Sequence, residues 1–125
     1  MSDVYACELA RKLNVKRGMT VRVLGKPADV DLQELSISQV AGADGVLLFA
    51  RTLAELEATA QPLLEAAAAD HLAWLAYPKA GQLGTDLNRD IIWRHLLERG
   101  VQGVRQIALD GVWSAMRFRP VKEER

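Results

Sequence analysis

The chain has 125 residues, of which 50% are hydrophobic, and its 16 Lys and Arg balance its 16 Asp and Glu. This length and composition fit one domain with a single core. Cys7 is the only cysteine, which excludes an intramolecular disulfide and a cysteine-based metal cluster, and we expect it to be a small buried residue in a helix. The zero net charge argues against a nucleic-acid binder, since such proteins are normally basic overall.

The apolar segments are too short to cross a membrane. The longest uncharged apolar run covers residues 72–78, far below the roughly 20 residues that span a bilayer, and no charged leader precedes a signal core. We therefore expect a cytoplasmic protein that does not enter a membrane. We expect one domain over residues 1–121 and a frayed tail over 122–125.

The N-terminal residues predict an amphipathic helix. Ser2 is a suitable capping residue, and apolar residues follow it at helical spacing. The residues expected on the buried face of this helix are Tyr5, Ala6, Leu9, Ala10 and Leu13.

A strand is expected next. Residues 19–25 alternate in polarity with a β-branched bias and stop at a Gly-Lys-Pro turn, which predicts the first strand. Asp29 or Asp31 could cap a short helix that ends at Leu35. Residues 37–40 fit either a helix end or a short strand.

The middle of the chain predicts a strand, a helix and a second strand. Residues 45–50 are continuously apolar, as in a strand that is covered on both faces. Thr52 and Glu55 form a capping box at the start of a helix, and Pro62 should bend that helix in its middle. Residues 71–77 predict the next buried strand.

The last third predicts a helix and a hairpin. Residues 85–100 have helical periodicity, with Thr85 as the expected cap and Gly100 as the stop. The dipeptide Asp110-Gly111 separates two alternating runs and is a strong hairpin signal. A two-residue turn there would place Ile107 on the same face as Ser114. Strands alternating with helices before a hairpin predict a three-layer α/β fold, with a mainly parallel sheet and an antiparallel edge.

The segment after the predicted strand 71–77 is a candidate ligand-binding turn. In open α/β sheets, ligands bind beyond the carboxyl ends of the strands. Lys79 could meet an anion there, and Thr85 could cap the helix or donate to the ligand. The segment also fits an ordinary strand-to-helix connection, because it is shorter than a phosphate loop and Asp86 would repel an anion.

Arg89 falls on the apolar side of the predicted helix 85–100. A guanidinium in that position needs a partner, which Asp110, Asp86 or a bound anion could supply. Alternatively, the stem of Arg89 packs on Trp93 while its charge reaches solvent or a structural carboxylate.

The residues that usually carry out catalysis lack suitable partners. Ser114 has no obvious general base, and His71 and His95 do not have the spacing of metal ligands. Trp113 is expected in the core rather than on a stacking surface. We therefore lean towards a protein that is not an enzyme and holds no metal.

Five segments together resemble a family of small bacterial proteins of unknown function. This chain and the family share the elements YPK, TDL, A-x-D and WSA-x-(R/K)-F. The segments are LNVKRGMTVRVLGKP, GVLLFARTLAELE, YPK, TDLNRD and VRQIALDGVWSAMRFR.

That family is similar to Rossmann-fold methyltransferases, whose last strands also form a hairpin, and the resemblance therefore implies a Rossmann-like scaffold. The first predicted strand lacks the acidic residue and the Gly-x-Gly turn that would hold S-adenosylmethionine, so no cofactor is expected. The residues that match the family pattern are candidates for a ligand or interaction surface: Lys79, Thr85, Asp86, Asp110, Trp113, Ser114, Arg117 and Phe118.

Three functions follow as hypotheses. The first is a non-enzymatic regulatory or protein-interaction module, with a protein partner or a homodimer formed through the hairpin edge. The second is a protein that binds a small anionic or nucleotide-like ligand, or a degenerate methyltransferase-like enzyme. It requires Lys79 and Arg89 to converge on a pocket. The third is a nucleic-acid binder, which requires its arginines on one exposed face. Those arginines are Arg22, Arg105, Arg117 and Arg119.

Overall fold

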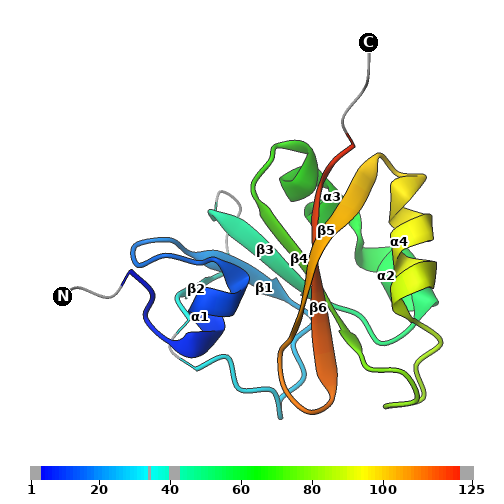
Figure 1. The fold of residues 1–125 in the computed structure, drawn as a ribbon, viewed down its shortest axis with the longest axis horizontal. Helices are drawn as coiled ribbons and strands as arrows, with labels where there is room; N and C mark the ends of the chain where they lie inside the picture. Colours follow the sequence, from blue (N-terminus) through cyan, green and yellow to red (C-terminus); the bar gives the residue numbers. More distant parts are fainter. Residues whose placement is uncertain (1–3, 34, 40–42, 122–125) are drawn as a thin grey trace.

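The computed structural model describes residues 4–33, 35–39 and 43–121 and has an α/β fold built on a six-stranded sheet (Figure 1). The strands are β1 (Val21–Leu24), β2 (Ile37–Ser38), β3 (Gly45–Phe49), β4 (Leu72–Pro78), β5 (Val101–Ala108) and β6 (Trp113–Pro120). The helices are α1 (Glu8–Leu13), α2 (Leu53–Thr59), α3 (Gln61–Ala68) and α4 (Arg89–Leu97).

The sheet is mostly parallel. Its strand order is β2-β1-β3-β4-β6-β5. The pairs β1–β2, β1–β3 and β3–β4 are parallel, whereas β6 is antiparallel to both β4 and β5. Among the strands that the structure describes, β6 alone therefore runs in the reverse direction. This confirms the predicted mainly parallel sheet with a C-terminal antiparallel hairpin.

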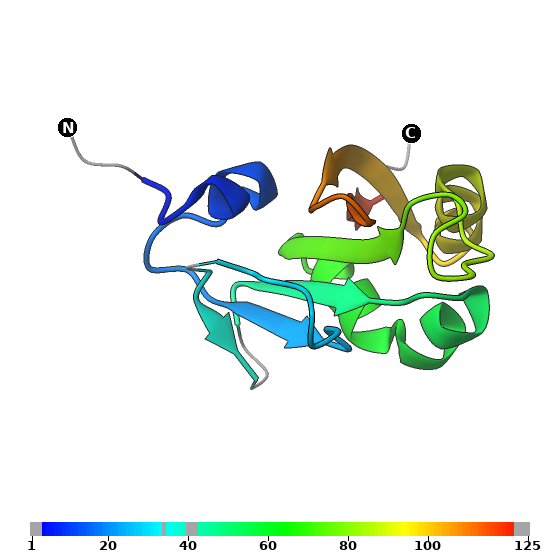
Figure 2. The same ribbon diagram turned by 90° about the horizontal axis from the view of Figure 1, so that it is seen from below.

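Core residues lie on both faces of the sheet. Helices α2, α3 and α4 pack on one side, which we call the α2–α4 face, and α1 packs on the other, the α1 face (Figure 2). Strands β3 and β4 are buried along their whole length, which explains their continuous apolar sequences. The α2–α4 face includes Leu48, Leu75, Leu63, Ile92, Leu96 and Phe118. The α1 face includes Leu13, Leu47, Phe49, Trp74 and Trp113.

Helix α1 is tied to the sheet by a tryptophan. The indole Nε1 of Trp74 in β4 donates a buried hydrogen bond of 3.0 Å to the carbonyl oxygen of Leu13, at the end of α1. Leu9, Ala10 and Leu13 are buried as predicted. The C-terminal end of this short helix is therefore fixed over the middle of the sheet.

The start of α1 differs from the prediction. The helix begins at Glu8, and Ser2, the expected cap, lies outside the described residues. Cys7 is a half-buried N-cap residue and not a buried helical residue, so that expectation was wrong. Its backbone is extended, and its side chain packs with that of Tyr5 against the core of the α1 face. Tyr5 and Ala6, which were expected on the helix, therefore precede it.

The helix expected between Asp29 or Asp31 and Leu35 is absent from the described residues of that segment. The carboxylate of Asp31 instead accepts a hydrogen bond from the backbone N–H of Gln33 at 2.8 Å. Aspartate thus closes a local turn here, which competes with helix formation. Of the two alternatives for residues 37–40, the strand is observed, as β2.

The predicted capping box forms in part. Thr52 accepts a hydrogen bond from the Glu55 N–H at 3.2 Å, but the Glu55 carboxylate accepts from the Arg51 N–H at 3.0 Å and not from Thr52. One bent helix was expected after it, and two helices are observed, α2 and α3, with Pro62 in the first turn of α3. Proline favours that position because it has no N–H to donate.

Helix α4 begins later than predicted. Its cap is Asn88, whose side-chain oxygen accepts from the Ile91 N–H at 2.9 Å. The predicted cap Thr85 instead donates its hydroxyl to the Arg51 carbonyl oxygen at 2.6 Å and accepts from the Leu87 N–H at 3.0 Å. Both residue types cap helices well, and the contact of Thr85 with the loop before α2 removes it from that role.

The hairpin turn is one residue longer than predicted. The Leu109 N–H donates to the Trp113 carbonyl oxygen at 2.9 Å, and Ile107 pairs with Ala115. The side chain of Asp110 accepts from the N–H groups of Val112 and Trp113 and stabilises the longer turn. A slip of one residue moves side chains to the other face, so the prediction that Ile107 lies with Ser114 was wrong.

Strand β5 also contains a β-bulge. Gly103 pairs with Phe118 and Arg105 with Arg117, so Val104 has no partner in β6. Val104 is exposed, and the Trp93 indole Nε1 lies 3.4 Å from the Gly103 carbonyl oxygen, to which it donates. The bulge brings the start of β5 into contact with α4.

Candidate functional site

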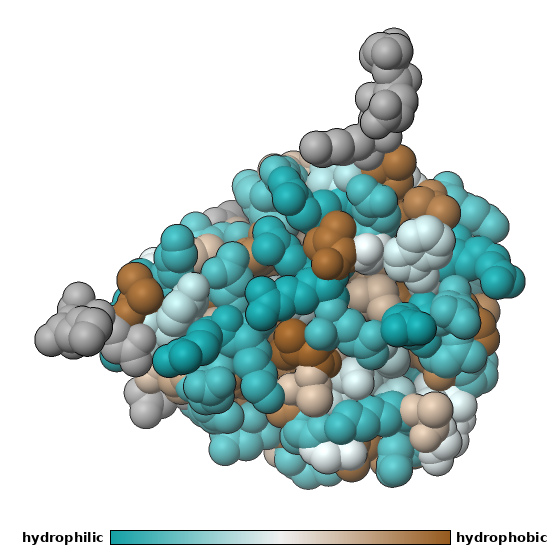
Figure 3. Space-filling model, in the orientation of Figure 1, coloured by the Kyte–Doolittle hydropathy of each residue, from teal (hydrophilic) through white to brown (hydrophobic). Residues whose placement is uncertain are grey.

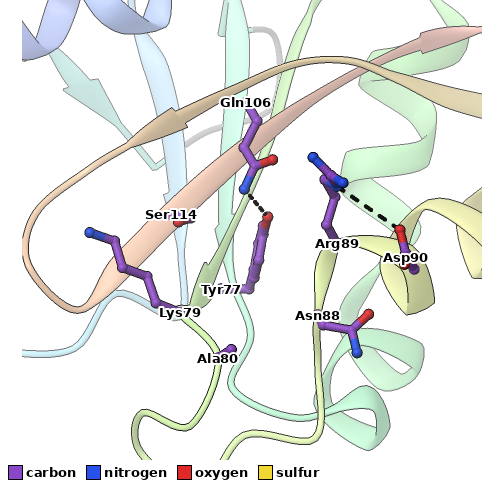
Figure 4. Close-up of a pocket in the computed structure, with 8 residues that line it drawn as sticks. All are labelled: Tyr77, Lys79, Ala80, Asn88, Arg89, Asp90, Gln106 and Ser114. Atoms are coloured by element: carbon purple, nitrogen blue, oxygen red, sulfur yellow. Dashed lines mark hydrogen bonds and ion pairs between the residues drawn. The ribbon is translucent and has the colours of Figure 1, made fainter.

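A groove runs along α4 at the carboxyl end of β4, between the helix and the β5–β6 hairpin. Its first part is a cavity of about 370 Å³, and an adjoining cavity of about 380 Å³ shares Arg89, Asp90 and Gln106 with it. We call both parts together the α4 groove. The first cavity is lined by Tyr77, Lys79, Ala80, Asn88, Arg89, Asp90, Gln106 and Ser114 (Figure 4).

Tyr77 and Gln106 lie at the centre of the first cavity. The Gln106 side-chain amide in β5 donates a hydrogen bond of 2.7 Å to the hydroxyl oxygen of Tyr77, near the end of β4 (Figure 4). Ser114 of β6 lies between these strands, because it pairs with Tyr77 on one side and with Ala108 on the other. Three strands thus contribute to one wall of the cavity.

The environment of Tyr77 favours the protonated phenol. The residue is only 3% exposed, and burial raises the pKa of its hydroxyl above the usual 10.0, against the smaller effects of the Arg89 charge and the Gln106 hydrogen bond. A phenol that accepts one hydrogen bond keeps its own proton for donation. Tyr77 can therefore offer a hydrogen bond to a bound group at neutral pH.

The two candidate cations do not converge. Lys79 and Arg89 lie on opposite sides of the Tyr77–Gln106 pair, and neither side chain is directed towards the other (Figure 4). Arg89 forms an exposed ion pair of 4.0 Å with Asp90. A concave site therefore exists where the sequence suggested one, without the paired clamp expected for an anion.

Arg89 is not on a buried face of α4. Its side chain is 69% exposed, and Trp93 is 42% exposed, while Ile92 and Leu96 are fully buried. The expectation of an arginine directed towards the apolar side was therefore wrong. Arg89 is the first residue of α4 and lies before Ile92, the first buried residue of the helix.

Thr85 and Asp86 support the fold and do not line the groove. The Asp86 carboxylate accepts a hydrogen bond of 2.9 Å from the Leu53 N–H, the first residue of α2. The free N–H groups at a helix start favour such an acceptor. Together with the contact between Thr85 and Arg51, this bond fixes the loop before α4 against the start of α2.

Three further candidates lie elsewhere. Asp110 holds the hairpin turn. Trp113 is 2% exposed and meets Phe49 edge-on, with ring centroids 5.2 Å apart, which confirms its expected place in the core. Arg117 is half-buried opposite Trp74, on the α1 face. Of the predicted surface, only Lys79, Arg89 and Ser114 meet in the groove.

The sequence did not identify Asn88, Asp90 and Gln106 as lining residues. Asn88 carries a usable signal, because it precedes Ile91 by three residues and is a strong capping type. Gln106 has no such signal: its contact with Tyr77 depends on the hairpin register and on the order of the strands.

The crevice between the ends of β1 and β3 is narrow. Gly25 has a φ of 73°, and a Cβ there would lie 2.8 Å from the Phe49 carbonyl oxygen. The cavity at this point has about 210 Å³, below the range of about 300–1,000 Å³ typical of ligand pockets. The backbone approach at Gly25 leaves little room for a cofactor at this edge.

Comparison with protein-family models and with curated proteins finds no match for this chain. Within the ranges that the structure describes, no group of three His, Cys, Asp or Glu side chains could hold a metal ion. No helix in those ranges is long and apolar enough to cross a membrane.

Proposed function

We propose that this chain is a non-enzymatic interaction module on a three-layer, Rossmann-like scaffold, and that the α4 groove binds its partner. The observation that carries this proposal is the meeting of separate segments in one groove. Residues 77–79, 85–90 and 104–119 bear the YPK, TDL and WSA elements of the family resemblance. They contribute every residue that lines the first cavity except Ala80.

The chemistry of the groove supports binding over catalysis. Its lining residues include Ser114 but no histidine. His95 lies 3.7 Å from Glu57 on the other side of α4, and His71 borders a separate cavity beside α3. A serine nucleophile needs a base within hydrogen-bond reach, and the described lining offers none to Ser114.

The surface around the groove has the mixed character of a protein interface. Trp93 lines its second part and is 42% exposed, beside the polar side chains of Asp90 and Gln106. Interfaces commonly combine an aromatic anchor with a polar rim. Here Trp93 would be the anchor, and the Asp90 and Gln106 side chains would form part of the rim.

The strand arrangement supports the proposed scaffold. A parallel sheet with a single reversed strand in a C-terminal hairpin is compatible with the resemblance to truncated Rossmann-fold methyltransferases. The narrow crevice at Gly25 agrees with a scaffold used for binding and not for methyl transfer.

Site-specific photo-crosslinking tests the interaction module. A photoreactive phenylalanine derivative is placed at Trp93 or Asp90, which line the groove, and at the exposed Ala68 of α3 as the matched control. In cells that produce the protein, a discrete crosslinked species is expected from the groove positions and not from Ala68. Crosslinks of equal yield at all three positions, or at none, would contradict the proposal.

A small anionic ligand is the second candidate, because Lys79 and the capped start of α4 border the same cavity. A thermal-shift screen with nucleotides, phosphosugars and simple anions tests it. Saturation at a hundred times the dissociation constant adds about 2.7 kcal/mol. For a ligand in the groove, Lys79→Ala abolishes the thermal shift and the exposed control Lys16→Ala does not.

Homodimerisation through β5 stays a prediction, which sedimentation velocity checks.

A further inference from the structure

A second charged feature lies on the β5–β6 hairpin, at the edge of the second part of the α4 groove, which Arg105 borders. Arg105 of β5 pairs directly with Arg117 of β6. Directly opposite residues of an antiparallel pair have Cβ atoms about 4.5–5.5 Å apart, and like charges there are destabilising. The surface over the hairpin mixes hydrophilic and hydrophobic residues (Figure 3).

The neighbouring carboxylate of Asp70 is bound directly to a third arginine. Asp70 binds Arg119 with two hydrogen bonds of 3.0 and 3.1 Å. Within the described residues, neither Arg105 nor Arg117 forms an ion pair, and the buried Nε of Arg117 has no hydrogen-bond partner. Burial lowers the pKa of Arg117, and the charges of Arg119 and, to a smaller extent, of Arg105 lower it further, while the charge of Asp70 acts in the opposite direction.

Both arginines are carried by strands of the sheet. Arg117 lies in the ladder between Trp74 of β4 and Arg105 of β5, so its backbone is fixed on both sides. Arginine presents several N–H donors in a planar fork that suits bidentate binding of oxyanions. Two such forks on residues that pair across the hairpin, with an unused donor on one, are suited to a group that carries two negative charges and several acceptor oxygens.

We propose that Arg105 and Arg117 form an anion site for the phosphoryl group of a small phosphorylated molecule. Arg105 also borders the second part of the α4 groove, whereas Arg117 lines neither part. Crosslinking from Trp93 tests the partner groove and pyrophosphate binding tests the arginine pair, so the two proposals can fail separately. A nucleic-acid backbone is disfavoured, because Arg22 borders a cavity beside α3 on the α2–α4 face, so the arginines do not form one continuous track. The bound phosphoryl group would relieve the repulsion between the two guanidinium groups.

Isothermal titration with pyrophosphate and inorganic phosphate, at constant ionic strength, tests this site. Saturable binding is expected, weakened at least about tenfold, a difference of about 1.4 kcal/mol, in Arg105→Gln and in Arg117→Gln. Arg22→Gln, on the other face, is the matched control and should bind as the wild type does. Arg105 is exposed, so its replacement should leave the fold intact even if Arg117→Gln does not fold.

The melting temperature gives a second readout. Without phosphate, Arg105→Gln should melt at a higher temperature than the wild type, because the repulsion is gone, and pyrophosphate should reverse that order. Absence of saturable binding, or equal binding by Arg105→Gln, would overturn the proposal.

Vesicles with phosphatidic acid and a 20-mer duplex DNA serve as further probes. The proposal is overturned if the protein binds vesicles or DNA more tightly than pyrophosphate and Arg105→Gln loses that binding. The ligand would then be a membrane or a nucleic acid and not a small molecule. Weaker binding of both supports it.

Discussion

The hydroxyl of Tyr77 accepts a 2.7 Å hydrogen bond from the side-chain amide of Gln106. This bond connects β4 to β5, two strands that do not pair with each other because β6 lies between them. It also separates Lys79 from Arg89 in the groove (Figure 4). The shape of the groove therefore depends on a contact between residues 29 positions apart in the chain.

We expect the Tyr77–Gln106 hydrogen bond to contribute to stability in its own right. Tyr77→Phe and Gln106→Ala should each lower the free energy of unfolding, and a double-mutant cycle should give a coupling of about 0.5–1.5 kcal/mol. Urea denaturation measures all four proteins. As a control, the effects of Tyr77→Phe and of the exposed Gln82→Ala on the free energy of unfolding should add. If the effects of Tyr77→Phe and Gln106→Ala also add, no specific bond joins Tyr77 to Gln106.

The raised pKa of Tyr77 predicts a loss of stability at alkaline pH. The folded protein keeps the phenol proton to a higher pH than the unfolded chain does, whose tyrosine ionises near 10.0. The stabilisation that comes from the raised pKa of Tyr77 is therefore complete below the pKa of the unfolded chain. It disappears as the pH rises through the higher pKa of the folded protein. Denaturation curves between pH 8 and about 11.5 should fall more steeply for the wild type than for Tyr77→Phe. Parallel curves would refute the shift.

Asp86 is expected to act on stability and not on binding. Asp86→Ala removes the acceptor for the Leu53 N–H at the start of α2 and should cost about 0.5–2 kcal/mol, as the loss of a helix cap does. Asp86→Asn keeps an acceptor and should recover most of that loss. Asp90→Ala removes a nearby exposed carboxylate and should cost less. Crosslinking from Trp93 should survive Asp86→Ala; its loss would assign Asp86 to the interface.

Gly103 should be sensitive to a single methyl group. A Cβ there would lie 2.7 Å from the Met116 sulfur and 2.8 Å from Trp93 Cδ1. Overpacking of this kind costs about 1–3 kcal/mol, so Gly103→Ala should lower the melting temperature and displace Trp93. The combination with Trp93→Ala should cost less than the sum of the single changes. Gly111→Ala is the control, because nothing lies within 4 Å of its Cβ position.

The sequence predicted the elements whose pattern reflects burial. Strands β3 and β4 were evident because both of their faces are covered, which requires continuous apolar runs. Leu9 and Leu13 were assigned correctly to the core for the same kind of reason. Local chemistry was less decisive: Thr85 and Asn88 are both good caps, and the choice between them depended on a contact with Arg51 far along the chain.

The candidate site was predicted only in part, because its geometry depends on register. The turn at Asp110-Gly111 was located correctly, but its length was not, and that error placed Ile107 on the wrong face. Gln106 could not be matched with Tyr77 without the order of β4, β6 and β5. Lys79 was found because it directly follows a buried strand, a feature that is visible in one stretch of sequence.

The bulge at Val104 has a consequence for the protein in solution. Strand β5 is the last in the sheet, so one of its edges is open to other chains, and a straight open edge favours aggregation. Deleting Val104 would leave the partners of Gly103 and Arg105 unchanged while making the ladder regular. Such a variant should fold and yet self-associate with rising concentration. One surplus residue is thus expected to keep the open edge from pairing with other chains.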